Sequence, residues 1–172
     1  MKTLLTLLTC LLILSPTVVM SETMNDLLMR DGLYYKKFTD VPFTGKITGN
    51  KQGSFKDGKK VGQWTSYHRN GQLKTKGTYK DGKKNGLWVR YHENGKLHSK
   101  SNYKDGKRDG PFIFYFYTGQ LGSKGTYKND KRDGPWVFYE VNGTKRFTKD
   151  ASGGVIFHEG SGTYKNGKKI SD

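Results

Sequence analysis

The sequence is poor in cysteine, in proline and in the aliphatic residues that fill a globular core. Its 172 residues include one cysteine, Cys10, and four prolines, and hydrophobic residues make up 33% of the chain. A single cysteine excludes a disulfide-stapled scaffold. The low hydrophobic share excludes a large single core. A thin repetitive architecture needs fewer apolar residues, because each unit packs only against its neighbours.

Aromatic residues and glycine are abundant by contrast. The chain holds 11 Tyr, 9 Phe and 3 Trp, together 13% of its residues, and 23 glycines. Disordered chains are poor in aromatic residues, so this composition indicates a folded protein. Many Gly and Tyr with few Pro predict many short strands joined by tight turns.

The first 21 residues differ from all that follow. Lys2 is their only charge, an apolar run extends over residues 4–14, and Pro16 interrupts it before the small residue Ser21. This layout is typical of a secretory signal peptide, so residues 1–21 are predicted to form a signal helix. The mature protein is then expected to be exported, either periplasmic or secreted. An uncleaved anchor is the alternative, because the apolar run is at the short limit for a spanning helix.

Acidic residues are scarce, with 15 Asp and Glu against 31 Lys and Arg. Removal of residues 1–21, which hold one lysine and no acid, leaves a net charge of +15. A charge of this sign favours anionic partners, such as lipid headgroups, acidic glycans or acidic proteins. Export argues against nucleic acid as the partner.

The sequence superposes on itself at a period of 24 residues. Residues 62–85, 86–109 and 110–133 are regular copies, and a fourth copy starts at residue 134. The residues that recur in phase are Gly62, Gly86, Gly110 and Gly134; Trp64, Trp88, Phe112 and Trp136; Tyr67, Tyr91, Tyr115 and Tyr139; and Tyr79, Tyr103 and Tyr127. A register this regular predicts tandem structural repeats.

Each unit is predicted to hold two strands, at about residues 64–68 and 73–80 in the first regular copy. Asn70-Gly71 and Asp81-Gly82 supply residues that tolerate positive φ, so both are expected to form tight hairpin turns. Gly62 and its counterparts are expected to let the backbone approach an aromatic ring closely. The sequence therefore predicts an all-β protein, an elongated single-sheet antiparallel meander of tandem 24-residue β-hairpin repeats after the signal helix.

The ends of the array depart from the regular pattern. Residues 22–37 are expected to be a lead-in, and residues 38–170 the repeat domain. The predicted units are 38–61, 62–85, 86–109, 110–133 and 134–170. The sequence pattern of the second strand returns at residues 161–168, about 13 residues later than the 24-residue period predicts. Residues 144–160 are therefore interpreted as an irregular insertion in the last unit. Atypical terminal units commonly cap a repeat array.

The repeated pattern G-x-W-x-x-Y-x-x-N-G-x-L-x-x-K-G-x-Y-K-D-G-K resembles the MORN-variant repeat of bacterial YwqK-like antitoxins. Leu33-Tyr34-Tyr35, followed by Pro42-Phe43-Thr44-Gly45, also resembles the start of that family. The resemblance covers roughly residues 33–143, with a weaker match at 161–168. It implies a repetitive β-sheet that serves as a protein-binding or membrane-associated scaffold, and it carries over no catalytic residue. The alternative function is neutralisation of a toxin partner, as an antitoxin or immunity protein.

Alternation along the second strand of each unit predicts two different faces. One face is expected to carry Leu73, Thr75, Gly77 and Tyr79, and the other Lys74, Lys76, Thr78 and Lys80. In the next unit, His98, Lys100, Asn102 and Lys104 are expected on the lysine side. Equivalent lysines should lie roughly 9–10 Å apart, in one row of Lys76, Lys100 and Lys124 and another of Lys80, Lys104 and Lys128. These six are the candidate residues for binding lipid headgroups or an acidic glycan; the alternative is that they keep a thin sheet soluble.

Residues 112–117 form an unbroken aromatic and aliphatic run, so both faces are apolar there. Phe114 and Phe116 are the candidate contact residues for a protein partner; the alternative is that the insertion at 144–160 covers them. The recurrent Trp and Phe of the first strands are interpreted as the core that joins neighbouring units.

No residue set indicates catalysis, a metal site or a cofactor. His68 and His92 occupy equivalent positions, but the later units place no histidine there, so no ligand cluster persists. The pair His158-Glu159 has no partner group for acid–base chemistry. The sequence therefore predicts a protein that is not an enzyme.

Overall fold

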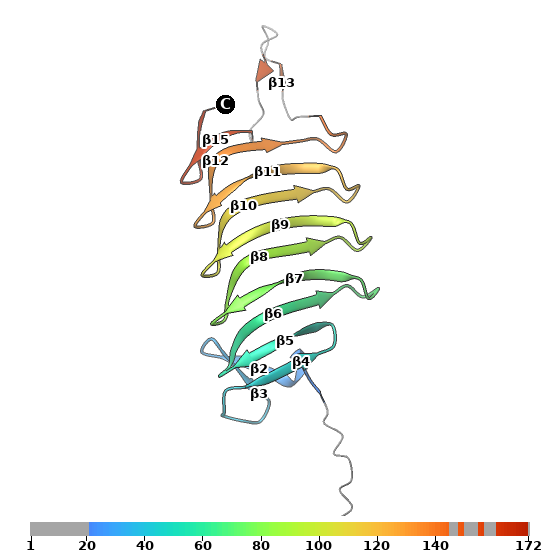
Figure 1. Ribbon diagram of the computed structural model, residues 1–172, viewed down its shortest axis with the longest axis vertical. Helices are drawn as coiled ribbons and strands as arrows, with labels where there is room; N and C mark the ends of the chain where they lie inside the picture. Colours follow the sequence, from blue (N-terminus) through green and yellow to red (C-terminus); the bar gives the residue numbers. More distant parts are fainter. Residues whose placement is uncertain (1–20, 145–147, 150–154, 157–160, 172) are drawn as a thin grey trace, which may run out of the picture.

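The computed structural model describes residues 21–144, 148–149, 155–156 and 161–171. Over these residues the chain is a long ladder of strands without an α-helix (Figure 1). The predicted signal helix lies outside the described residues, apart from Ser21, and stays a prediction. No helix in the described part of the chain is long and apolar enough to cross a membrane.

One twelve-stranded sheet forms the body of the molecule, and its strands follow one another in chain order. The strands are β1 (Glu22–Thr23), β4 (Gly45–Thr48), β5 (Lys51–Lys56), β6 (Lys59–Tyr67), β7 (Leu73–Lys80), β8 (Lys83–Tyr91), β9 (Leu97–Lys104), β10 (Lys107–Tyr115), β11 (Leu121–Lys128), β12 (Lys131–Phe138), β15 (Gly162–Lys165) and β16 (Lys168–Ser171). From β4 onward every neighbouring pair is antiparallel, which confirms the predicted meander. The first pair departs from it, because β1 lies parallel to β4.

Two different connections between strands alternate along the sheet, and they lie at opposite ends of the strands (Figure 1). At one edge, Asp81 and Gly82 both have positive φ, 49° and 78°, and join Lys80 directly to its partner Lys83. This is the two-residue turn that the sequence predicted. The Gly82 N–H also donates to the Lys60 carbonyl, at 2.9 Å, so each turn is bonded to the preceding unit.

The connection at the other edge differs from the prediction. Gly71 has a φ of 81°, but Asn70 does not have positive φ. The His68 N–H donates to the Gln72 carbonyl at 2.8 Å, so the loop holds the residues between them instead of the Asn-Gly pair alone. The Asn70 side chain accepts from the Gln72 N–H at 3.0 Å. Asn70 was therefore placed correctly in a hairpin connection, but the expected conformation was wrong.

The glycines that begin each regular copy do not lie against rings, which corrects the prediction for Gly62 and its counterparts. Gly62, Gly86 and Gly134 have φ values of 67°, 72° and 72°, and no atom lies within 4 Å of where a Cβ would be. The pairing register shifts beside Gly86, between Lys76 and Thr78 of the preceding strand. These glycines therefore allow a β-bulge, and the strands begin earlier than predicted because they run through it.

The close approach occurs at the glycine of the second strand instead. A Cβ on Gly53, Gly77 or Gly125 would lie 2.3, 2.2 and 2.2 Å from the indole of Trp64, Trp88 and Trp136 respectively. Each tryptophan therefore lies flat over a glycine of the preceding strand. The three indole N–H groups donate to backbone carbonyls, those of Val61, Thr78 and Thr126.

The aromatic side chains form the core along one face of the sheet, here called the aromatic face. Ring centroids are 5.1 Å apart for Phe55 and Trp64, 5.6 Å for Trp64 and Tyr79, and 5.0 Å for Tyr79 and Trp88. The planes meet edge to face, the arrangement that aromatic quadrupoles favour. The first-strand tryptophans are buried, as predicted for the core that joins units.

A small hairpin covers the N-terminal end of the aromatic face. It consists of β2 (Leu27–Arg30) and β3 (Leu33–Lys36), which follow a short 3-10 turn at Met24–Asp26. Leu27 is buried with Phe55, and the Tyr34 ring lies 4.9 Å from the Phe55 ring. The lead-in is therefore a structural cap for the first unit.

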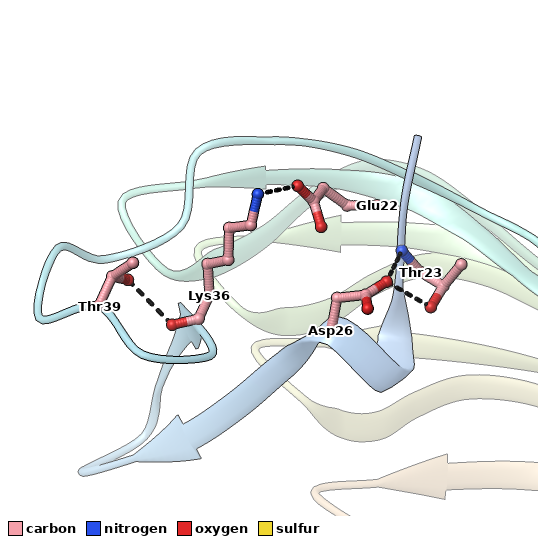
Figure 2. A network of polar contacts seen from close by, with 5 residues as sticks. All are labelled: Glu22, Thr23, Asp26, Lys36 and Thr39. Carbon is pink, nitrogen blue, oxygen red and sulfur yellow. Dashed lines mark hydrogen bonds and ion pairs between the residues drawn. The ribbon is translucent and has the colours of Figure 1, made fainter. Parts of the chain in front are cut away.

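Polar contacts hold this cap in place (Figure 2). The Asp26 carboxylate accepts from the Thr23 hydroxyl and the Thr23 N–H, at 2.7 and 2.8 Å. These hydrogen bonds hold the pKa of Asp26 below its ordinary value. Lys36 pairs with Glu22, and the Thr39 hydroxyl donates to the Lys36 carbonyl at 2.9 Å.

At the C-terminal end of the sheet, the chain adds two more strands after the irregular segment. Strand β15 pairs with β12, which places Tyr164 opposite Gly134. Within 144–160 the structure describes only Thr144 and two short strands, β13 (Thr148–Lys149) and β14 (Val155–Ile156), which pair with each other. His158 and Glu159 lie outside the described residues.

Candidate anion-binding face

The first predicted lysine row exists as a continuous line across the sheet. Lys76 pairs with Thr65 and Val89, Lys100 with Val89 and Ile113, and Lys124 with Ile113 and Val137. Lysines and β-branched residues therefore alternate along one line. All three lysines are exposed, on the side of the sheet opposite the tryptophans.

The second predicted row is doubled in the structure. Lys80, Lys104 and Lys128 each pair directly with a second lysine across the two-residue turn, namely Lys83, Lys107 and Lys131. The same pairing joins Lys56 to Lys59 and Lys165 to Lys168. These partners were not predicted from the sequence, although the recurrent Lys-Asp-Gly-Lys motif contains both lysines. We call this surface, the ten turn lysines with Lys76, Lys100 and Lys124, the lysine face.

Among the described residues, no acid forms an ion pair with a lysine of the lysine face. The ion pairs found between described residues are Arg30–Asp40, Lys36–Glu22, His68–Glu93 and Arg108–Asp130. None of them involves a lysine of this face, and all thirteen of its lysines are exposed. Like charges placed directly opposite each other on a sheet destabilise the pair. The thirteen lysines outnumber the four exposed aspartates of the turns between them, so this surface carries a net positive charge.

The cations of the aromatic face are arranged differently. Lys60 lies 4.7 Å from the Trp64 ring centre, Lys84 lies 4.6 Å from that of Trp88, and Arg132 lies 5.1 Å from that of Trp136. Burial lowers the pKa of both Lys60 and Lys84. These side chains cover the core through cation–π contacts, so they differ from the free lysines of the other face.

Phe114 and Phe116 do not join the lysines. Their ring centroids are 5.4 Å apart, and a Cβ on Gly122 would lie 2.5 Å from the Phe114 ring. Phe114 pairs with Ser99 and Ser123, which places it on the aromatic face. Both phenylalanines are half-buried. Their role in binding a protein stays a prediction.

The recurrent histidines bond one unit to the next. His68 Nε2 lies 3.0 Å from the Tyr91 carbonyl, and His92 Nε2 lies 3.0 Å from the Tyr115 carbonyl. Asn70 adds a bond to the Glu93 carbonyl, at 2.8 Å. Among the described residues, no group of three or more His, Cys, Asp or Glu side chains is arranged to hold a metal ion.

His98 does not lie on the lysine side, which corrects the prediction. The register shifts at its position, because Arg90 pairs with Ser99 and Tyr91 pairs with Leu97. This bulge turns His98 to the aromatic face, where its ring lies 5.2 Å from Phe114. Strict alternation fails wherever one strand holds an extra residue.

Comparison with known families identifies the repeat. Residues 60–81, 84–105 and 108–129 match the family model described as MORN repeat variant. Each matched segment spans one strand pair: β6 and β7, β8 and β9, or β10 and β11. None of the curated proteins compared with the chain matches it. The match does not extend to the YwqK-like antitoxin assignment, which stays a prediction.

Proposed function

We propose that this protein, which carries three consecutive MORN-variant repeats, is a non-enzymatic exported scaffold that binds an anionic envelope surface through its lysine face. The observation that carries the proposal is the paired row of exposed lysines, which face one another across every Lys-Asp-Gly-Lys turn of the array.

The arrangement supports binding better than it supports solubility alone. Solubility is served by charges of both signs interspersed over a surface. Here one sign is concentrated on one face, at some cost in stability from the directly opposed lysines. Each lysine close to an anionic membrane contributes about 1 kcal/mol of attraction. An extended sheet presents several such lysines to one membrane surface, so their individual attractions add up.

Co-sedimentation with vesicles tests this proposal. The protein without residues 1–21 is expected to sediment with vesicles that contain phosphatidylglycerol and not with neutral phosphatidylcholine vesicles. Binding should weaken as salt rises, because the lysines are exposed and screened. Equal binding to both kinds of vesicle would overturn the proposal.

A matched pair of variants tests the face. Reversal of Lys76, Lys100 and Lys124 to Glu removes at least about 3 kcal/mol of attraction, roughly a hundredfold in affinity. The control reverses the exposed Lys37, Arg69 and Lys96, which lie in the lead-in and the wider loops and change the net charge equally. The control should retain most of the binding. Equal losses in both variants would show a non-specific charge effect and contradict the assignment of the lysine face.

A further inference from the structure

A cavity of about 440 Å³ opens on the aromatic face, opposite the lysine face, between β7 and β10. It lies where the ladder of rings is loosest. The Trp88 and Tyr103 centroids are 6.3 Å apart, against 5.0 Å for Tyr79 and Trp88. Phe112 lines the cavity on its other side.

The cavity results from two coupled departures from the repeat. Elsewhere an indole lies over a glycine of the preceding strand, as Trp88 does over Gly77. Ser101 occupies that glycine position in the next unit, and its partner in β10 is Phe112 in place of a tryptophan. A serine side chain would occupy the space of the indole, and the smaller phenyl ring does not fill the remainder. The core is therefore open at this one unit.

Two variable positions of the repeat place polar groups in the same cavity. Arg90 lines it, whereas the equivalent positions hold Ser66, Phe114 and Phe138. His98 also lines it, whereas the equivalent positions in the neighbouring units are Lys74 and Gly122. Two departures from the repeat, Ser101 and Phe112, and two side chains at variable positions, Arg90 and His98, thus converge on one space.

The lining combines cations, hydroxyl groups and rings, and it contains no acid. The cations are Lys84, Arg90 and Arg108, and the hydroxyl groups belong to Thr75, Ser99 and Ser101. Arg108 is already bonded to Asp130 at 3.0 Å, and Lys84 lies over Trp88. Arg90 has no ion-pair partner among the described residues. Its planar guanidinium is thus available for a bidentate contact with a carboxylate.

We infer that this cavity binds an acidic sugar unit, a pyranose ring that carries a carboxylate. Arg90 takes the carboxylate, the serine and threonine hydroxyls bond to the sugar hydroxyls, and the aromatic side chains contact the apolar face of the ring. The volume lies within the range of about 300–1,000 Å³ typical of small-molecule sites. The site is separate from the lysine face, so it adds a shaped ligand site to the proposed surface binding.

His98 provides an internal reporter for this site. Burial lowers the pKa of His98, and the positive charges of Arg90 and His92 lower it further. Lys84 and Arg108 are the other charged groups that line the cavity, and both are cationic. A bound carboxylate would favour the imidazolium form, so ligand binding should raise the His98 pKa. By linkage, the affinity for the acidic sugar should increase as the pH falls and His98 becomes protonated.

Titration with a digalacturonate tests the inference, with the neutral disaccharide of the same ring size and free acetate as the other two probes. Calorimetry should show binding of the digalacturonate at least roughly tenfold tighter than either probe, because the neutral disaccharide lacks the charge-assisted contact with Arg90 and acetate lacks the sugar ring. The His98 imidazole resonances should report a raised pKa in the complex. Binding of the neutral disaccharide with equal affinity, or no binding of the digalacturonate, would overturn the inference.

Two variants locate the site. Arg90→Gln should weaken digalacturonate binding roughly tenfold or more. The double variant Ser101→Gly with Phe112→Trp restores the repeat pattern and fills the cavity, so it should abolish binding while the melting temperature stays equal or rises. The K76E/K100E/K124E variant should bind the digalacturonate normally, which separates this test from that of the lysine face. Unchanged binding by the cavity-filled variant, or loss in the lysine-face variant alone, would contradict the site.

Discussion

At the scale of single residues, the fold depends on a glycine in one strand and a tryptophan in the next. A Cβ on Gly77 would lie 2.2 Å from the Trp88 ring, well inside van der Waals contact. The indole can lie flat on the sheet only because that Cβ is absent. The chain also contains a natural replacement for this pair, Ser101 opposite Phe112.

Substitution at this pair should show strong coupling. We expect Gly77→Ser to destabilise the protein by about 1–3 kcal/mol, because it forces the indole out of its position. Trp88→Phe alone should also destabilise, because it leaves a gap over Gly77. The double variant should be more stable than the sum of the two losses implies, by about 0.5–3 kcal/mol. Urea denaturation of the four proteins of this cycle measures the coupling; simple additivity would mean that the pair is not a packing unit.

At the scale of elements, the two connections of each repeat have different tasks. The two-residue turn needs positive φ at both positions and is bonded to the preceding unit through Gly82. The wider loop, between His68 and Gln72, needs positive φ only at Gly71. It is bonded to the next unit through His68 and Asn70. Both kinds of connection therefore contribute hydrogen bonds between units, in addition to those between paired strands.

The two-residue turn should tolerate asparagine and reject a β-branched residue. Asp81 has a φ of 49°, and Asn166 occupies the same position in the last turn with a φ of 50°. Asp81→Val should cost about 1–2 kcal/mol, because a β-branched side chain is strained in the left-handed region. Asp81→Asn should leave stability nearly unchanged. The urea midpoints of both variants check this, and a valine variant as stable as the asparagine variant would contradict the turn assignment.

The sequence predicted the elements of this array better than their local geometry. The period, the strand pairs and the Asp-Gly turns followed directly from recurrent residues, because each repeat supports the interpretation of the others. The bulges at Gly86 and beside His98 did not, since an extra residue on one strand leaves no mark in the alternation pattern. For that reason the prediction from sequence assigned His98 to the wrong face and placed the close approach to a ring at the wrong recurrent glycine.

The candidate site was predicted in part for the same reason. The rows of Lys76 and Lys80 follow from alternation within β7, because the extra residues of the bulge beside Gly86 lie on the neighbouring strand β8. Lys83 and its counterparts were missed because their position depends on the pairing across the turn. The cavity near Arg90 required the structure, because it arises from residues on four strands that are separated in sequence.

At the scale of the whole molecule, the sheet is a one-dimensional array in which each unit contacts only its neighbours. Adjacent strands are spaced by about 4.8 Å, so the twelve strands of the sheet extend over roughly 50 Å. The stability of such an array is approximately a sum of unit and interface contributions. Whole units should therefore be removable, whereas half units should not.

Deletion of residues 86–109 removes one strand pair and should leave a folded, shorter sheet. Phe112 then faces Gly77, so the unit interface remains apolar, and the urea dependence of unfolding should fall with the smaller buried surface. Deletion of residues 86–97 removes half a unit and reverses the direction of every later strand. That variant should lose the sheet, as seen by circular dichroism and proteolysis. Two deletions of equal stability would contradict a 24-residue structural unit.

The direction of the backbone hydrogen bonds determines how this sheet responds to tension. The first and last strands, β1 and β16, lie at opposite ends of the long axis, and the hydrogen bonds between strands run along that axis (Figure 1). A pull on the two ends therefore opens the bonds of one strand in succession instead of shearing all of them together. Each eight-residue strand such as β7 releases roughly 26 Å of extended chain. The sheet should therefore lengthen one strand at a time, and at low force, when its two ends are pulled apart.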